Sequence, residues 1–282
     1  VKHKPQGTYR IIILGGSTAF GFNATSDDTT IGAYLERILQ SRMPGKSFQV
    51  YSMAIPGYIS SQELITLEFY GVDYAPDMVI DINGFNDLCD AMDSPDATPD
   101  YAAHSDALIN AYKIFWESSF LKFSAASIMR WSAFVSHTNE VIRARIPRPV
   151  FHDPAAVKKI KDRDGRVAFY VKNMYSMGAL AERYHFQLVS VLQPTLLFKQ
   201  HLTEKEKTLL KSYQTAINEK QFYPEAILTY YPRMRAQVSE AMEATGQSFI
   251  DLSTVFENTT EDIFTDMVHL VDRGNELFAE AL

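Results

Sequence analysis

A short segment near the N-terminus carries the first residues that could do chemistry. The stretch IIILGGSTAFGF, residues 11–22, is an apolar run that breaks at two glycines and then presents Ser17 and Thr18. Glycine-rich turns after strands often bind phosphate, but a P-loop needs Lys and then Ser or Thr after its last glycine, and here Phe22 follows Gly21. The spacing GxGxxG is absent as well. The turn therefore either presents Ser17 as a nucleophile or uses its hydroxyl only as a turn cap.

Three later segments carry residues that would assist a serine nucleophile. MAIPGYISSQE contains Gly57, NGFNDL contains Asn86, and FTDMVHLVDRGNELFAEAL contains Asp266 and His269 three residues apart. A histidine within hydrogen-bond reach can take the proton of a serine hydroxyl, and an aspartate can hold the imidazole in the required tautomer. The i, i+3 spacing predicts that this pair lies on one side of a helical turn. Taken singly, Gly57 and Asn86 are equally typical of ordinary turns. Asp266 and His269 are equally typical of the start of a surface helix.

Five segments rich in β-branched or aromatic residues predict the strands that must position these side chains. They span residues 9–14, 48–53, 78–82, 187–192 and 249–252. Their alternation with helical segments predicts an α/β fold, a flavodoxin-like three-layer α/β/α sandwich with a five-stranded parallel sheet. Ligands of such sheets bind beyond the carboxyl ends of the strands. Ser17, Gly57 and Asn86 follow the first, second and third predicted strands.

Helical periodicity and cap signals predict the elements between the strands. A one-sided helix begins near Ile31 and stops at Pro44-Gly45. The next opens with SSQE, in which Ser60 and Glu63 would form a capping box, and ends at Gly71. Further helices are expected over residues 166–183, 203–219 and 232–245.

The alternation stops between the third and fourth strands. The chain is therefore expected to be a single domain, residues 1–282, with an insertion at about 90–165. Aromatic residues of the insertion share one helical face: Tyr112, Phe115, Trp116, Phe120 and Phe123. This stripe either packs the insertion onto the body, which is the favoured interpretation, or forms a lid over the substrate.

Composition excludes several classes of function. With 282 residues, 46% of them hydrophobic and 22% charged, the chain can bury a full core. A net charge of −7 does not favour binding to nucleic acid or to an anionic lipid surface, both of which attract positively charged proteins. The lone cysteine, Cys89, excludes an intrachain disulfide, and neither HExxH nor CxxC spacing occurs, so no metal and no cofactor is expected.

The sequence predicts no membrane span within this chain. The most apolar long stretch, residues 113–135, is interrupted by Glu117, Lys122 and Arg130 and so fails as a membrane span. The chain begins at Val1 rather than Met, which favours a processed protein or a fragment whose signal peptide or anchor is removed. Export or anchoring in a bacterium is the resulting expectation, and the location itself stays open.

The four segments together resemble the SGNH, or GDSL-type, hydrolase family, which is named for Ser, Gly, Asn and His in chain order. Ser17, Gly57, Asn86 and His269 occur in that order. The resemblance covers the chain from Tyr9 to the end apart from the insertion, and the DxxH block with its trailing HLVDRGN is its most specific part. It implies the SGNH hydrolase fold and a serine hydrolase.

The resemblance also implies a role for each residue. Ser17 would be the nucleophile, His269 its base and Asp266 the acid that orients the imidazole. The oxyanion hole would comprise the backbone N–H groups of Ser17 and Gly57 and the side-chain amide of Asn86. Gly57 suits this task because a missing Cβ lets its backbone approach a substrate closely.

The first block departs from the family pattern. In the family this block often reads Gly-Asp-Ser-Leu, whereas residues 15–18 of this chain read Gly-Gly-Ser-Thr. Because the triad acid of the family comes from the DxxH block, the change bears on loop packing and substrate fit, and it removes no catalytic group.

The expected function is a serine esterase that removes a small acyl group, such as acetyl, from a carbohydrate or related polar ester through an acyl-enzyme on Ser17. An acyltransferase shares the first half-reaction and differs only in the acceptor. A lysophospholipase or thioesterase with an aromatic lid is the second enzymatic interpretation. A noncatalytic carbohydrate-binding protein on the same scaffold is a different class, against which the intact set of site residues argues. The sequence leaves the acyl donor, the acceptor and the oligomeric state open.

Overall fold

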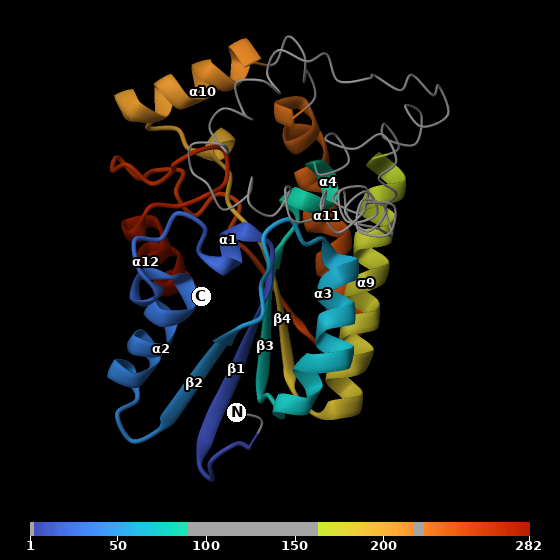
Figure 1. Ribbon diagram of the computed structural model, residues 1–282. Helices are drawn as coiled ribbons and strands as arrows, with labels where there is room; N and C mark the ends of the chain where they lie inside the picture. The colour runs from blue at the N-terminus through green and yellow to red at the C-terminus, as the bar shows by residue number, and fades with distance from the viewer. Residues whose placement is uncertain (1–2, 90–162, 217–222) are drawn as a thin grey trace, which may run out of the picture.

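A five-stranded parallel sheet organises the chain (Figure 1), as the computed structural model describes it for residues 3–89, 163–216 and 223–282. The strands are β1 (Thr8–Gly15), β2 (Ser47–Ser52), β3 (Met78–Asn83), β4 (Gln187–Leu192) and β5 (Ser248–Asp251). Their spatial order is β2-β1-β3-β4-β5, and every neighbouring pair is parallel. The predicted sheet is confirmed, with each strand within two residues of its expected bounds.

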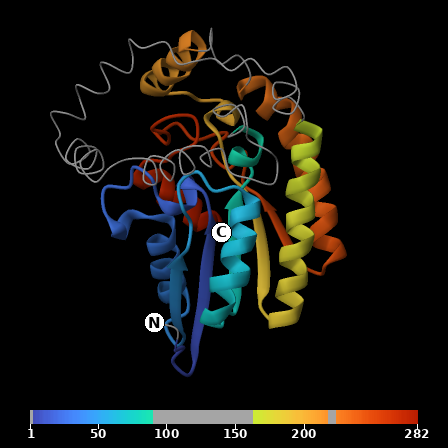
Figure 2. The ribbon, with the colours of Figure 1, turned by 45° about the vertical axis from the view of Figure 1, so that its right-hand side comes forward.

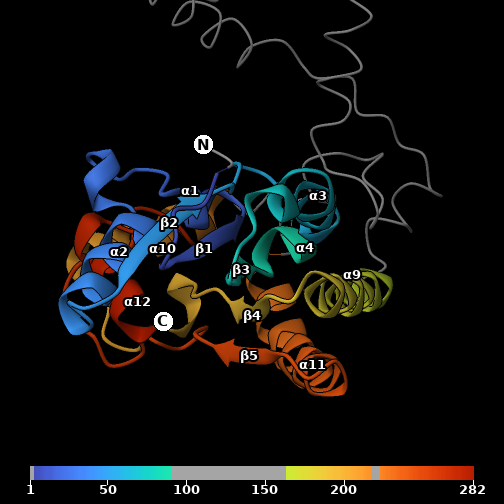
Figure 3. The same cartoon turned by 90° about the horizontal axis from the view of Figure 1, so that it is seen from below.

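Helices cover both faces of the sheet, which gives three layers (Figure 3). On one face lie α2 (Ile31–Arg42) and α12 (Asp272–Ala281), and on the other lie α3 (Ser60–Thr66), α9 (Arg163–Tyr184) and α11 (Tyr223–Ala244). Along β1, Ile11 and Ile13 pack into the core beneath α2 and α12, and Ile12 and Leu14 pack into the core beneath α9 and α11. A strand buried on both faces is apolar at every position, which explains the continuous run Ile11–Leu14.

Two short helices stand at the carboxyl ends of the first and third strands (Figure 1, Figure 2). They are α1 (Ser17–Phe20) after β1 and α4 (Phe85–Cys89) after β3. The remaining long helix, α10 (Glu204–Ala216), follows β4 after a 3₁₀ turn at Leu196–Phe198. One further 3₁₀ turn, Asp27–Thr29, precedes α2.

The capping box expected at Ser60 and Glu63 is wrong. The residue that caps α3 is Ile59, whose backbone N–H donates to Gln62 Oε1 at 3.1 Å. Ser60 and Glu63 are instead both buried, and their side chains hydrogen-bond to residues of β3 and α4. A buried polar network therefore overrides the local cap signal.

Two other helix boundaries also differ from expectation. The helical segment does not end at Gly71, because a π turn (Leu67–Gly71) and then a 3₁₀ turn (Val72–Tyr74) follow α3 directly. Further along, α11 begins at Tyr223 and contains Pro232 in its interior. Ile227 and Tyr231 are completely buried, so packing extends this helix ahead of Pro232, the start that the sequence predicts.

Some expectations fall on residues that the structure does not describe. The insertion at about 90–165 and its aromatic stripe lie outside the described residues, except that α9 already begins at Arg163. No helix within residues 3–89, 163–216 or 223–282 is long and apolar enough to cross a membrane. In the same ranges, His, Cys, Asp and Glu side chains form no cluster of three that could hold a metal ion.

Three carboxyl groups are buried together on the α3 and α9 side of the sheet: Glu63, Asp81 and Asp87. The Asn83 amide nitrogen donates to Glu63 at 2.7 Å and to Asp81 at 2.6 Å. Burial raises the pKa of Asp81 to about 7, and burial together with the charges of Asp81 and Asp87 raises the pKa of Glu63 well above its usual range. Glu63 Oε1 and Asp81 Oδ1 lack a partner among the described residues, and one proton shared between them would satisfy both.

This cluster should make the protein more stable in mild acid. Because the folded-state pKa of Asp81 is raised, its contribution to the free energy of unfolding is fully present below about pH 4 and is lost as the pH rises through about 7. Asp81→Asn, which stays neutral, should therefore raise the free energy of unfolding at about pH 8 and flatten its pH dependence. Denaturant unfolding at a series of pH values measures both effects. The exposed Asp28→Asn is the matched control, and equal slopes in parent and Asp81→Asn would contradict the interpretation.

Candidate active site

Ser17 is the first residue of α1, immediately beyond the carboxyl end of β1. The preceding Gly16 is the cap residue of α1, and Gly21 ends the helix in a left-handed conformation. Thr18 Oγ1 donates to the carbonyl of Val268 at 3.3 Å and accepts from Gln193 Nε2 at 3.1 Å. The nucleophile candidate is therefore held on a short helix that is tied to the segment carrying His269.

A chain of hydrogen bonds joins Ser17, His269 and Asp266. Ser17 Oγ lies 2.6 Å from His269 Nε2, and His269 Nδ1 lies 2.5 Å from Asp266 Oδ2. With Nδ1 donating to the aspartate, Nε2 is the free acceptor for the serine hydroxyl proton. The three residues that the sequence proposed as a triad thus meet in the order that proton transfer from Ser17 requires.

Asp266 is kept ionised by its hydrogen bonds. Burial alone would raise its pKa, but the His269 side chain and two backbone N–H groups, those of Val268 and His269, lower the pKa below its usual value. Both N–H groups donate to Asp266 Oδ1 at 2.9 Å. The negative charge beside His269 Nδ1 would stabilise an imidazolium when His269 takes up a proton.

The predicted helical turn for Asp266 and His269 is wrong. Both lie in a loop that is closed by an antiparallel bridge between Phe264 and Leu270, and α12 begins only afterwards. The Asp266 side chain accepts from the backbone two and three residues ahead, which folds the loop back and turns His269 toward Ser17. The i, i+3 spacing correctly predicts that the two side chains lie close together, although they lie in a loop and not in a helix.

A buried ion pair anchors this loop, and sequence reasoning missed it. Glu206 of α10 accepts from the backbone N–H groups of Ile263 at 3.0 Å and Phe264 at 3.3 Å. Lys199, whose side chain is fully buried, pairs with Glu206 and donates to the carbonyl of Glu261. The only signal in the sequence was a run of charged residues, EKEK, which is equally typical of an exposed helix face.

Asn86 lies beside the Ser17 turn, on α4. Its side-chain Nδ2 donates to the carbonyl of Tyr58 at 2.8 Å. A Cβ on Gly16 would come within 2.4 Å of Asn86 Nδ2, so only glycine at position 16 allows this close approach. Asn86 therefore connects the turn after β1 to the turn after β2.

Gly57 lies in that second turn, in a left-handed conformation with φ of 83°. Tyr58 N donates to Ile55 O at 3.1 Å, and Ile55 N donates to Gly15 O at 3.1 Å, which fixes the turn against β1. Within the described ranges, neither the Ser17 nor the Gly57 backbone N–H donates to another backbone group. Among the described residues, we find no hydrogen-bond partner for these two donors or for the second N–H of the Asn86 amide.

An apolar side chain lies beside the histidine of this chain of hydrogen bonds. The ring of Phe22 lies against His269, with centroids 4.8 Å apart. Phe22 is 45% exposed. Phe20, at the end of α1, and Ile55, in the turn that holds Gly57, are also exposed.

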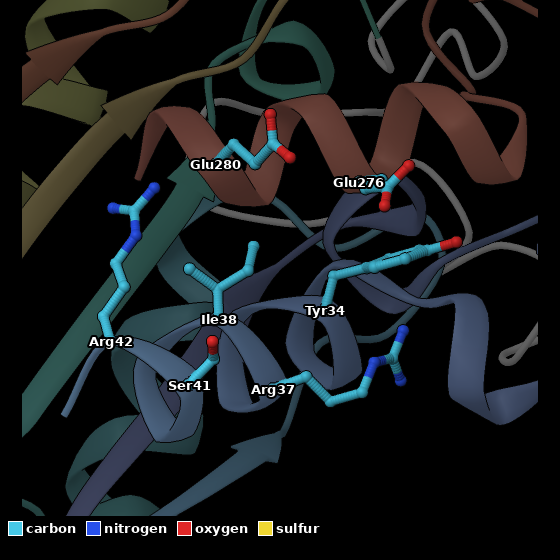
Figure 4. A pocket seen from close by; sticks show the side chains of 7 residues that line it. All are labelled: Tyr34, Arg37, Ile38, Ser41, Arg42, Glu276 and Glu280. Atoms are coloured by element: carbon cyan, nitrogen blue, oxygen red, sulfur yellow. The ribbon is translucent and has the colours of Figure 1, made fainter. Parts of the chain in front are cut away.

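A separate groove lies between α2 and α12 (Figure 4), and none of the five predicted site residues lines it. Its lining residues are Tyr34, Arg37, Ile38, Ser41, Arg42, Glu276 and Glu280. The groove mixes both signs of charge and offers no group in the arrangement that nucleophilic catalysis requires. We therefore consider the Ser17 turn, and not this groove, as the candidate active site.

Comparison with known proteins gives matches among solved structures alone, since no family model and no curated protein sequence matches the chain. Axe2, an acetylxylan esterase from Geobacillus stearothermophilus, matches with a TM-score of 0.52 at 13% identity, over 97% of this chain and 91% of its own. The acetyl xylan esterase AlAXEase matches with a TM-score of 0.51 at 11% identity, over 96% of each chain. A candidate GDSL-like lipase from Parabacteroides merdae matches with a TM-score of 0.52 at 12% identity, over 97% of this chain and 93% of its own.

At such low identity these likenesses establish the fold. The chain has the fold of the SGNH, or GDSL-type, hydrolases, as its sequence blocks suggested.

The contact between Gly16 and Asn86 generates a test of the site. Gly16→Ala should displace the Asn86 amide, and so slow the labelling of Ser17 by a fluorophosphonate by at least about tenfold, because one donor to the developing charge is lost. Gly45→Ala is the matched control, since a Cβ at Gly45 meets nothing within 4 Å. Labelling by both variants at the parent rate would show that Asn86 does not serve the reacting centre.

Proposed function

We propose that the protein is a serine esterase of the SGNH type, which hydrolyses or transfers a small acyl group through an acyl-enzyme on Ser17. The observation that carries the proposal is the chain of hydrogen bonds from Ser17 through His269 to Asp266, at 2.6 and 2.5 Å. The proposal treats the chain as one hydrolase domain with an insertion at about 90–165. Its partner is a small-molecule or carbohydrate ester.

The proposed reaction begins with proton transfer. His269 Nε2 takes the hydroxyl proton of Ser17 while Ser17 Oγ attacks the ester carbonyl carbon, and the carbonyl oxygen becomes an oxyanion. When the tetrahedral intermediate collapses, the bond to the leaving oxygen breaks and His269 returns the proton to that oxygen. An ester of Ser17 remains. In the second half-reaction, water or another hydroxyl attacks this ester, again with His269 as the base.

Three donors would stabilise the oxyanion: the backbone N–H groups of Ser17 and Gly57 and the Asn86 side chain. The placement of Asn86 against the turn that follows β2 supports this assignment. A donor that is held rigidly before the reaction is worth roughly 3 to 4 kcal/mol of transition-state stabilisation. Asn86 is therefore expected to affect the rate strongly without being required for acyl-enzyme formation.

An acetylated carbohydrate is the first choice of substrate. The names of two matched structures, both acetylxylan esterases, support that choice. An acyltransferase would use the same residues with a different acceptor. A noncatalytic carbohydrate-binding protein is disfavoured, because such a protein has no chemical need for an ionised Asp266 aligned on His269 and Ser17.

An esterase for longer acyl chains, such as a lysophospholipase or thioesterase, is the second candidate. The exposed Phe22 against His269 favours it, because an apolar side chain beside the histidine suits an alkyl chain. The aromatic residues that would form a lid for this function belong to the insertion, outside the described residues.

Mutation should separate the roles of Ser17 and Asn86. Ser17→Ala removes the nucleophile, so esterase turnover and covalent labelling by a fluorophosphonate should both vanish. Asn86→Ala removes one oxyanion donor, so turnover should fall roughly a hundred- to a thousandfold while slow labelling persists. Thermal melting near that of the parent shows that each variant is folded. Undiminished turnover by Ser17→Ala would mean that the turn after β1 is only structural.

A series of p-nitrophenyl esters with acyl chains of two to twelve carbons should separate the two substrate classes. For the acetylated substrate we expect kcat/KM to be highest for acetate and to fall as the chain lengthens, because added methylenes meet no preformed pocket. A rise of kcat/KM with chain length would instead favour the lipid-type esterase. Absence of turnover across the series, with Ser17 still labelled, would favour a transferase.

A further inference from the structure

We propose that Asp87 is a positioning residue, which locks the turn carrying Gly57 to the helix carrying Asn86 and so sets the separation of two oxyanion donors. The inference rests on the proposed function and adds a group that does not touch the substrate. Asp87 follows Asn86 on α4, and its carboxylate meets Ser60 at the start of α3, three residues beyond Gly57.

The contacts between Asp87 and Ser60 are short and multiple. The Ser60 hydroxyl donates to Asp87 Oδ1 at 2.5 Å, and the Ser60 backbone N–H lies 3.1 Å from Oδ1 and 3.3 Å from Oδ2. Ser60 and Asp87 are 1% and 5% exposed. Because hydrogen bonds to a charged, buried acceptor are about twice as strong as neutral ones, this pair is the firmest connection between the two segments.

Asn173 of α9 fixes the direction of the hydroxyl bond. Its side-chain nitrogen donates to Ser60 Oγ at 2.8 Å and to Ser61 Oγ at 3.0 Å. Since Ser60 Oγ already accepts from Asn173, the one proton of its hydroxyl is directed to Asp87. The orientation of this bond is thus determined by the surrounding side chains.

Two parallel ties therefore join the same segments. Asn86 binds the carbonyl of Tyr58, and its neighbour Asp87 binds Ser60, two residues further on. The Asn86 tie uses one of its two amide N–H groups and leaves the other for substrate. Without Asp87, the Asn86 amide would make the remaining described hydrogen bond from α4 to this turn, and it would also have to serve the oxyanion.

The charge on Asp87 is maintained although its side chain is buried. Burial raises the pKa of Asp87 to about 6, and hydrogen bonds from Ser60 and the positive charge of Arg166 oppose the rise. Arg166 also donates to the Asp87 carbonyl at 3.3 Å. Glu63, Asp81 and Tyr170 are the other titratable groups of this cluster. Near neutral pH the carboxylate is available as the acceptor that Ser60 requires.

Hydrogen exchange tests this role independently of activity. Asp87→Leu removes both acceptor oxygens, and Ser60→Ala removes only the hydroxyl, so the second variant keeps the test valid if the first does not fold. In both, amides of residues 55–62 should exchange at least about tenfold faster than in the parent, while those of β1 and β3 keep the parent rate. Asp87→Asn retains one oxygen and should restore slow exchange in part.

Kinetics then test whether the lock acts through Asn86. Asp87→Leu should lower kcat for p-nitrophenyl acetate about ten- to a hundredfold with KM changed less than about twofold. In the Asn86→Ala background the same substitution should cost less than about threefold, because its target is already absent. Asp81→Leu, equally buried but without contact to Ser60, is the matched control, and its effect should be additive with Asn86→Ala.

Unchanged exchange in folded Asp87→Leu or Ser60→Ala would overturn the proposal, and so would additive effects of Asp87→Leu and Asn86→Ala. Failure of the proposed function has a different signature. In that case the parent shows no esterase activity that depends on Ser17, and the exchange rates of residues 55–62 still decide whether Asp87 holds the two segments together.

Discussion

The hydrogen bond between Ser17 and His269 is the interaction that places the strictest geometric demand on the fold. It joins residues 252 positions apart in the chain at 2.6 Å, so the sheet, the short helix α1 and the loop before α12 must all be in place before it can form. Parallel strands bring the carboxyl ends of β1 and β3 to one edge, and buried polar contacts supply the remaining precision. Thr18 and Gln193 hold the serine side, and Glu206 holds the histidine side.

Buried charge is the physical cost of this precision. Lys199 pairs with Glu206, and the buried Glu63, Asp81 and Asp87 come from α3, β3 and α4, the helix that also carries Asn86. A buried polar group is tolerated when its hydrogen bonds are satisfied, and such networks specify one arrangement of the backbone even where apolar residues would be more stabilising. These buried charged residues therefore hold the loops of the site in place, and the apolar cores on either side of the sheet provide the stability.

The sequence was informative where a single physical signal dominates. Runs such as Ile11–Leu14 gave the strands, and the order of Ser17, Gly57, Asn86 and His269 gave the arrangement of the loops. It was misleading where tertiary contacts override local preference. Ser60 and Glu63 resemble a capping box but turn inward, and the loop of Asp266 and His269 is shaped by a backbone bridge. The pair of Lys199 and Glu206 was missed, because the run EKEK that contains Glu206 is equally typical of an exposed helix face and nothing marks Lys199 as its partner.

Mass spectrometry of the quenched reaction tests the central claim most directly. The protein is mixed with p-nitrophenyl acetate, quenched in acid during the first turnover and digested. The account predicts that the peptide containing Ser17 carries the mass of one acetyl group, that fragmentation places the group on Ser17, and that His269→Ala abolishes it. An acetyl group on another residue, or equal acetylation of Ser17 without His269, would contradict the account.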